Sequence, residues 1–109
     1  MADIERAVIG IRSRIEAGVR ISESLVLGAD FYESLDATQK DRARGVPPIG
    51  IGEASSLERA IVDKNARIGK GVRIKGDPDA PDRDGDGYFV RDGIVIIPKN
   101  GVVPDGAII

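Results

Sequence analysis

The chain has 109 residues and a formal net charge of -2, from 16 Lys and Arg against 18 Asp and Glu. This near-balance creates no overall field that would attract nucleic acid or an anionic membrane, so neither is expected as a partner. The sequence contains neither cysteine nor histidine. Disulfides and thiolate metal sites are therefore excluded, as are a histidine general base and histidine ligands to zinc. The length and the 41% hydrophobic content suit one domain over residues 1–109.

Nothing in the sequence predicts a membrane span or an export signal. No apolar run approaches the length needed to cross a bilayer. The first six residues, Met1 to Arg6, carry acidic charge where a signal peptide is basic and then apolar. A chain without cysteine is also compatible with a reducing compartment. We therefore expect a cytoplasmic protein.

Aliphatic residues recur at steps of six in three stretches of the chain. They are Ile9, Ile15, Ile21 and Leu27 in the first stretch, Val62, Ile68 and Ile74 in the second, and Ile97, Val103 and Ile109 in the third. Each follows a small or aliphatic residue two positions earlier. This pattern is typical of short parallel strands that turn the corners of a triangular prism, with both positions facing one shared core.

The first stretch also fits the apolar face of a helix, and taken alone it leaves helix and strand equally open. The residues on that helical face are Ile4, Val8, Ile11, Ile15 and Val19. The third stretch decides for strands, because its prolines and glycines would break a helix. These residues are Pro98, Gly101, Pro104 and Gly106. By analogy we extend the prediction to the first stretch and expect an all-β fold built of hexapeptide repeats.

Two loop excursions interrupt the repeat. Residues 28–48 are charged, end in a Gly-Val-Pro-Pro sequence and predict a surface loop with a helical turn, and residues 76–93 are rich in Asp, Gly and Pro. Between the excursions and around them, glycines are expected at the corners of the prism, where a positive φ favours glycine. The positions concerned are 10, 28, 52, 69, 71 and 106.

The second excursion resembles the beginning of a calcium-binding loop. Counting from Asp82, carboxylates occupy positions 1, 3 and 5, and Gly87 occupies position 6. Position 12, which needs a bidentate carboxylate, is Gly93. We therefore expect a solvated acidic turn and no metal site. The sequence also contains no Gly-rich phosphate loop and no Ser/His/Asp arrangement, so no catalytic residues are predicted.

The segment from Leu57 to Lys75 is locally basic, with six Lys and Arg against two acidic residues. Outward positions of such a prism are polar in any case, so these charges are compatible with a solvated exterior. Lysine also binds phosphate as a point charge, and a phosphate site therefore stays open.

Several segments in a fixed order resemble a known family. They are AVIGIRSRI at 7–15, LGADFYE at 27–33, PIGIGE at 48–53 and IVDKNARIG at 61–69, followed by GYFVRDGI at 87–94 and DGAII at 105–109. From about residue 4 to residue 109, the chain is similar to the C-terminal domain of ADP-glucose pyrophosphorylases (glucose-1-phosphate adenylyltransferases) of the cyanobacterial and plant type. The resemblance implies a left-handed parallel β-helix, whose hand does not follow from strand physics because parallel crossovers are usually right-handed.

The resemblance also implies a function. In that family this domain follows a nucleotidyltransferase domain that joins ATP to glucose 1-phosphate with Mg²⁺, for glycogen or starch synthesis. The catalytic domain is absent from these 109 residues, so the chain alone is expected to be inactive and to need no cofactor. The implied partners are a catalytic domain, further copies of the chain and a phosphorylated metabolite that acts allosterically. The alternative is a stand-alone β-helix scaffold that only self-associates.

Two activator lysines of the family carry over to this sequence. The one in the Asp-Lys-Asn-Ala-Arg motif falls on Lys64, and the one near the C-terminus falls on Lys99. Asp63, beside the first lysine, is expected to orient it or to balance its charge. The resemblance implies 3-phosphoglycerate as a typical activator and orthophosphate as an inhibitor. Because the family site also uses arginines of the catalytic domain, this chain is expected to hold only part of it.

Overall fold

The computed structural model describes residues 3–30 and 46–109, which form short strands. The strands are β1 (Asp3–Glu5), β2 (Val8–Ile9), β3 (Arg20–Ser22), β4 (Leu25–Val26), β5 (Gly50–Ile51), β6 (Ser56–Glu58), β7 (Ala60–Val62), β8 (Arg67–Ile68), β9 (Arg73–Lys75), β10 (Arg83–Asp84), β11 (Phe89–Arg91), β12 (Ile94–Ile97) and β13 (Val102–Val103). These ranges contain no helix, and so none that is long and apolar enough to span a membrane. The all-β prediction is confirmed.

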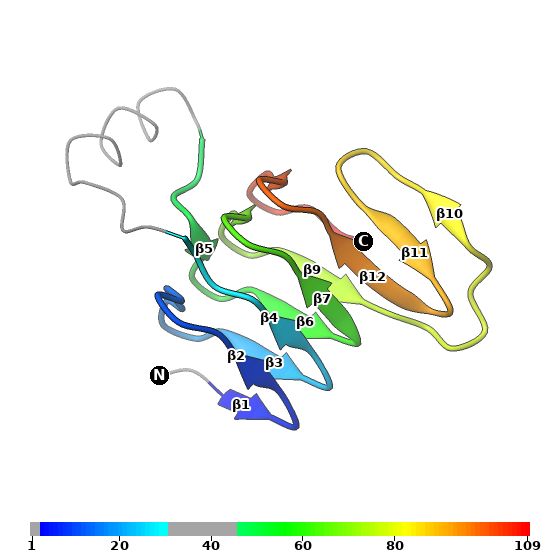
Figure 1. Cartoon of the computed structure of the whole chain (residues 1–109), viewed down its shortest axis with the longest axis horizontal. Coiled ribbons are helices and arrows are strands. Elements are labelled where there is room, and N and C mark those ends of the chain that lie inside the picture. The colour runs from blue at the N-terminus through cyan, green and yellow to red at the C-terminus, as the bar shows by residue number, and fades with distance from the viewer. Residues whose placement is uncertain (1–2, 31–45) are drawn as a thin grey trace.

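From β3 to β9 the chain passes from sheet A to sheet B to sheet C in turn, so the three sheets surround a common axis (Figure 1). Sheet A has the order β1-β3-β6-β9, sheet B the order β10-β11-β12-β7-β4-β2, and sheet C the order β13-β8-β5. Apart from the β10–β11 and β11–β12 pairs, all pairs are parallel. The chain is therefore a parallel β-helix, a three-sided coil that advances by one strand spacing per turn.

Each uninterrupted coil contains 17 residues. Ile4 pairs with Ile21, and Leu57 pairs with Ile74, one coil further along the chain. Two corners are turned in six residues, whereas the corner between sheets A and B is turned in five. At that corner Glu23 has a positive φ of 48°. The inward residue after Ile21 is consequently Val26, and the six-residue step was wrong in predicting Leu27 at this point.

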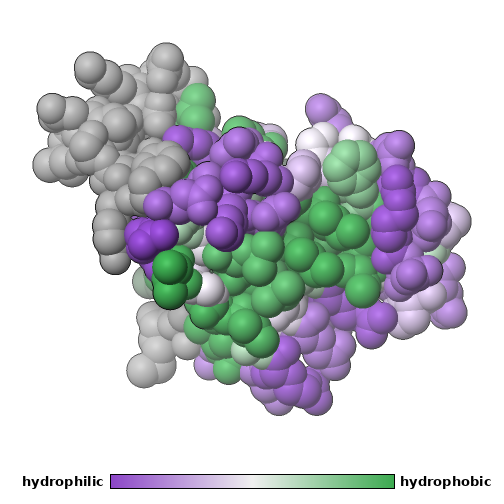
Figure 2. Space-filling view, viewed as in Figure 1, coloured by the Kyte–Doolittle hydropathy of each residue, from purple (hydrophilic) through white to green (hydrophobic). Residues whose placement is uncertain are grey.

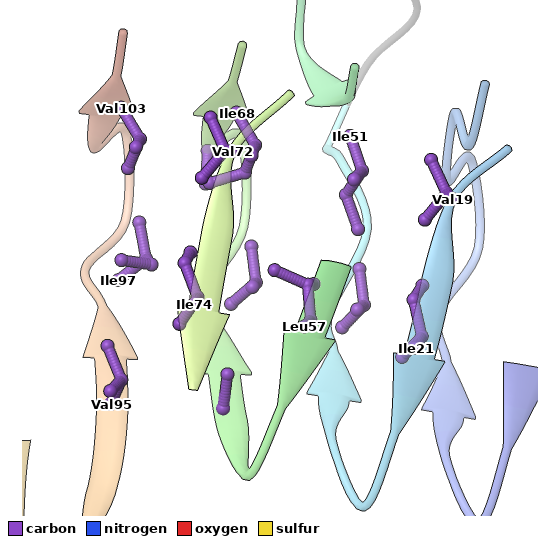
Figure 3. Close-up of a cluster of buried hydrophobic side chains, with 14 of the residues drawn as sticks. Val19, Ile21, Ile51, Leu57, Ile68, Val72, Ile74, Val95, Ile97 and Val103 are labelled. Atoms are coloured by element: carbon purple, nitrogen blue, oxygen red, sulfur yellow. The ribbon is translucent and has the colours of Figure 1, made fainter. Parts of the chain in front are cut away.

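The core is a narrow stack of aliphatic side chains that point inward from all three sheets (Figure 3). Equivalent residues of neighbouring coils pack on one another, and three such columns, one along each sheet, contain the Ile and Leu side chains of this buried cluster. The columns are Ile21, Leu57 and Ile74 in sheet A, Val26, Val62 and Ile97 in sheet B, and Ile51, Ile68 and Val103 in sheet C. Burying one such side chain contributes about 1.5–3 kcal/mol. The inward positions predicted for the second stretch are confirmed.

Glycine has two separate roles at the corners. Gly71 and Gly106 have positive φ angles of 64° and 74°, as expected for a turn that favours glycine. Gly52 does not have a positive φ, and there a Cβ atom would clash with the carbonyl group of Gly69 in the next coil. At Gly52 the missing side chain instead lets two coils approach closely.

The structure describes only the second of the two excursions in full. Most of 28–48 lies outside the described residues, and so does the predicted helical turn. Residues 76–93 contain strands β10 and β11, which extend sheet B by antiparallel pairing with β12. The sequence predicted only a loop here. Val90 is the inward residue of β11 and joins the core, which explains why this part of the excursion is ordered as a strand.

We expect Ile68→Ala to destabilise the fold by about 2–5 kcal/mol, because it leaves a cavity in the column between Ile51 and Val103. Ile68 is 1% exposed. The matched control is Ile108→Ala, which deletes the same atoms from a residue that is 79% exposed. Urea unfolding followed by circular dichroism measures both variants. Equal losses of stability would contradict the assignment of the core.

Candidate functional site

Lys64 and Lys99 lie at the same corner of the β-helix, in neighbouring coils. Lys64 lies two positions after Val62, the last residue of β7, and Lys99 lies two positions after Ile97, the last residue of β12. Val62 and Ile97 both point inward and are paired in register. Neighbouring parallel strands are separated by about 4.8 Å. The pairing of β7 with β12 thus brings together two lysines that are 35 positions apart in the sequence.

The two ammonium groups converge on one carboxylate, that of Asp30. Lys64 Nζ lies 3.4 Å from Asp30 Oδ1, and Lys99 Nζ lies 3.5 Å from Asp30 Oδ2. All three side chains are about half exposed, at 50% for Lys64, 55% for Lys99 and 41% for Asp30. The corner therefore carries an accessible cluster of two positive charges and one negative charge.

Asn65 holds Asp30 in this position. Its Oδ1 atom accepts a hydrogen bond from the Asp30 backbone N–H at 2.9 Å, and its Nδ2 group donates to Asp30 Oδ2 at 3.2 Å. The Asn65 backbone N–H in turn donates to the Gly28 carbonyl oxygen at 3.0 Å. Asn65 is buried and has a positive φ of 62°, a conformation that asparagine tolerates better than most residues. The carboxylate is thereby anchored to the next coil.

These contacts lower the pKa of Asp30. The hydrogen bond from the Asn65 side chain has the largest effect, partial burial opposes it, and the neighbouring Lys64 and then Lys99 add to the lowering. A carboxyl group with a lowered pKa is ionised at neutral pH. The negative charge between the two lysines is therefore permanent under physiological conditions.

Asp63 contacts the backbone of Lys64. Its Oδ1 atom accepts a hydrogen bond from the Lys64 backbone N–H at 2.7 Å, and its own N–H donates to the Ile97 carbonyl oxygen at 2.9 Å. Asp63 thus shapes the chain at the corner, whereas the Lys64 ammonium group lies against Asp30. The expected role of Asp63 in orienting the lysine or balancing its charge stays a prediction.

The other basic residues of 57–75 spread around the helix. Arg59 lies at the corner between β6 and β7, Arg67 lies in β8 of sheet C, and Arg73 and Lys75 lie in β9 of sheet A. The local excess of basic residues therefore does not gather on one face. The charge cluster is made by residues from three different coils. Asp30 was missed because no short-range sequence pattern connects it to the lysines, and Asn65, although it directly follows Lys64, was missed because its partner is Asp30.

Sheet B also carries an apolar row on its outer face. The strand register aligns Val8, Leu25, Ile61, Ile96 and Phe89 across five strands. Val8 and Phe89, at the two ends of the row, are 64% and 38% exposed. Figure 2 shows hydrophobic residues gathered on this face, over β4, β7 and β12. Polar residues were expected at the outward positions, and for this face that prediction was wrong.

The acidic turn that resembles a calcium loop uses two of its carboxylates internally. Asp84 Oδ1 lies 2.6 Å from the guanidinium group of Arg91, and Asp82 Oδ1 accepts a hydrogen bond from the Asp92 backbone N–H at 2.9 Å. In 3–30 and 46–109, no group of three potential metal-binding side chains comes together. The turn is thus explained by contacts within the β10–β11 hairpin.

We expect Asn65→Gly to raise the pKa of Asp30 towards its ordinary value, because the variant loses the hydrogen bond that lowers this pKa most. Glycine keeps the positive φ without strain. A lowered folded-state pKa gives stability that is present above the unfolded-state pKa and is lost as the pH falls through the folded-state value. The variant should therefore lose less stability on acidification than the wild type does.

An NMR titration of the Asp30 carboxyl carbon measures this pKa. Asn100→Gly is the matched control, because Asn100 occupies the equivalent corner one coil further on and has a φ of 61°. An unchanged Asp30 titration in Asn65→Gly would show that the Asn65 hydrogen bond does not control this carboxylate.

Comparison with known families gives a match that covers almost the whole chain. The model of the GlgC left-handed parallel β-helix domain matches residues 1–108. This match agrees with the three-sided parallel coil, and it supplies the left hand that strand physics alone does not predict. The chain belongs to the family of GlgC left-handed parallel β-helix domains, the C-terminal domains of ADP-glucose pyrophosphorylases.

Proposed function

We propose that this chain is a regulatory and assembly domain of a cytoplasmic glucose-1-phosphate adenylyltransferase that serves glycogen or starch synthesis. In this proposal Lys64 and Lys99 form part of an allosteric site for a phosphorylated metabolite. The observation that carries the proposal is the convergence of the two ammonium groups at one exposed corner, 3.4 and 3.5 Å from a shared carboxylate. Membership of the family supports the proposal that the enzyme is a glucose-1-phosphate adenylyltransferase.

The chemistry of the lysine pair suits an effector that has both a phosphate and a carboxylate, such as 3-phosphoglycerate. Each ammonium group has three N–H donors, so it can keep one acceptor and still bind another. Hydrogen bonds between charged partners are stronger than those between neutral ones. The half-exposed positions of both lysines leave them accessible to a ligand. Arginines of a catalytic domain would complete the site.

The apolar row on sheet B supports the assembly part of the proposal. A monomeric soluble protein rarely exposes a large contiguous apolar patch, and such patches mark contacts with other proteins. The row runs across the strands β2, β4, β7, β12 and β11. We propose that it packs against a catalytic nucleotidyltransferase domain or another copy of the chain.

A scaffold that only self-associates is the second candidate function. The same apolar row favours it, together with β1, which is an outermost strand of sheet A. At the other end of the sheet, the C-terminal residues pair with β9. A pure scaffold needs no anion site. The two functions therefore differ in whether Lys64 and Lys99 respond to a phosphorylated effector.

In a fusion of this chain with a compatible catalytic domain, we expect Lys64→Ala and Lys99→Ala each to raise the 3-phosphoglycerate concentration for half-activation by roughly ten- to hundredfold. Each variant removes a charge-assisted hydrogen bond worth about 1.5–3 kcal/mol. Activity without effector should change much less, because an allosteric residue affects the coupling between sites. Activator titrations of the fused enzyme measure both quantities.

Lys75→Ala is the control, since Lys75 is an exposed lysine in sheet A. If Lys64→Ala and Lys99→Ala shift activation no more than Lys75→Ala does, the effector site is not at this corner. The self-association scaffold would then be the better account.

A further inference from the structure

The lysine pair is already engaged with an anion that belongs to the protein. Each oxygen of the Asp30 carboxylate faces one ammonium group, Oδ1 towards Lys64 and Oδ2 towards Lys99. A ligand carboxylate or phosphate that bridged the two lysines would present its oxygens in the same way. Asp30 therefore stands where an anionic ligand would make its strongest contacts.

We propose that Asp30 is a built-in competitor for the anion site, which weakens effector binding to Lys64 and Lys99. This inference rests on the proposed function. It adds that Asp30 determines how tightly the site binds its effector. A bound anion must share the two ammonium groups with Asp30 or draw them away from it. Either way, the ion pairs of the free site oppose binding.

The carboxylate stays in place while the lysines can move. Two hydrogen bonds tie Asp30 to Asn65, one through its backbone and one through its carboxylate, and Asn65 is buried. Lys64 and Lys99 have long flexible side chains that are 50% and 55% exposed. An arriving ligand can therefore redirect the ammonium groups without displacing Asp30, and the lysines return to Asp30 when the ligand leaves.

The net charge of the cluster also indicates that Asp30 weakens the binding of an anion. The two lysines and Asp30 together carry one net positive charge, whereas the lysines alone carry two. Because its pKa is lowered, Asp30 contributes its negative charge throughout the neutral range. An incoming phosphate is therefore attracted less strongly than it would be by the lysine pair without Asp30.

The test is Asp30→Asn in the full 109-residue chain, titrated with inorganic phosphate and followed by the amide NMR signals of residues 63–65 and 99–100. Asparagine keeps the size of the side chain and removes its charge. Exposed ion pairs are weak, so the dissociation constant for phosphate should fall by only about three- to tenfold. Circular dichroism confirms that the variant is folded.

Asp63→Asn is the matched control, because it removes the same charge from a neighbour that contacts the Lys64 backbone instead of its ammonium group. Its effect on phosphate binding should be clearly smaller. An equal gain in Asp63→Asn would overturn the proposal, because the effect would then be one of general charge. A rise in the dissociation constant of Asp30→Asn would also overturn it, because Asp30 would then be assembling the site.

The combined variant Asp30→Asn/Lys64→Ala separates this inference from the proposed function. The gain should disappear in the combined variant, because the competitor and one of the groups it competes for are both removed. If phosphate binding is insensitive to Lys64→Ala and Lys99→Ala, the anion site itself is wrong. If binding depends on both lysines but does not strengthen in Asp30→Asn, the anion site stands and only the competition fails.

Discussion

The arrangement of this protein depends on the stacking of equivalent residues in neighbouring parallel coils. Backbone hydrogen bonds set the strand spacing, and the aliphatic columns, such as Ile51, Ile68 and Val103, keep each coil in register with the next. A one-residue slip would move inward side chains to the outside, so the buried columns specify the register strongly. Everything at a corner is positioned by the same register. Lys64 meets Lys99 because Val62 is stacked on Ile97.

Much of the fold could be predicted, because the core repeats at a short period. Val62, Ile68 and Ile74 were identified as inward residues from their six-residue step alone, and all three are buried. The five-residue corner was not predicted, because it depends on a positive φ at Glu23, a residue type that gives no turn signal. The β10–β11 hairpin was missed because its strands are short and lie within an excursion rich in Asp, Gly and Pro, a composition typical of loops.

The candidate site was predicted less completely than the fold. The motif resemblance identified Lys64 and Lys99, but nothing in the sequence joins them to Asp30, since that contact crosses coils and an excursion of the chain. The apolar row of sheet B was not predicted, because Leu25 and Ile61 adjoin inward aliphatic residues in the sequence. Only the strand register shows that these two residues face outward. The corner and the row give one small domain two distinct surfaces, one charged and one apolar, and we propose that the first binds a ligand and the second another protein.

We propose that Lys64 and Lys99 act as one anion site because the coil register brings them together. The most direct test follows the side-chain NMR signals of all the lysines while the chain is titrated with 3-phosphoglycerate. We expect Lys64 and Lys99 to respond together with one shared dissociation constant, while Lys70 and Lys75 change little. Responses of similar size at all four lysines, or different dissociation constants at Lys64 and Lys99, would contradict it.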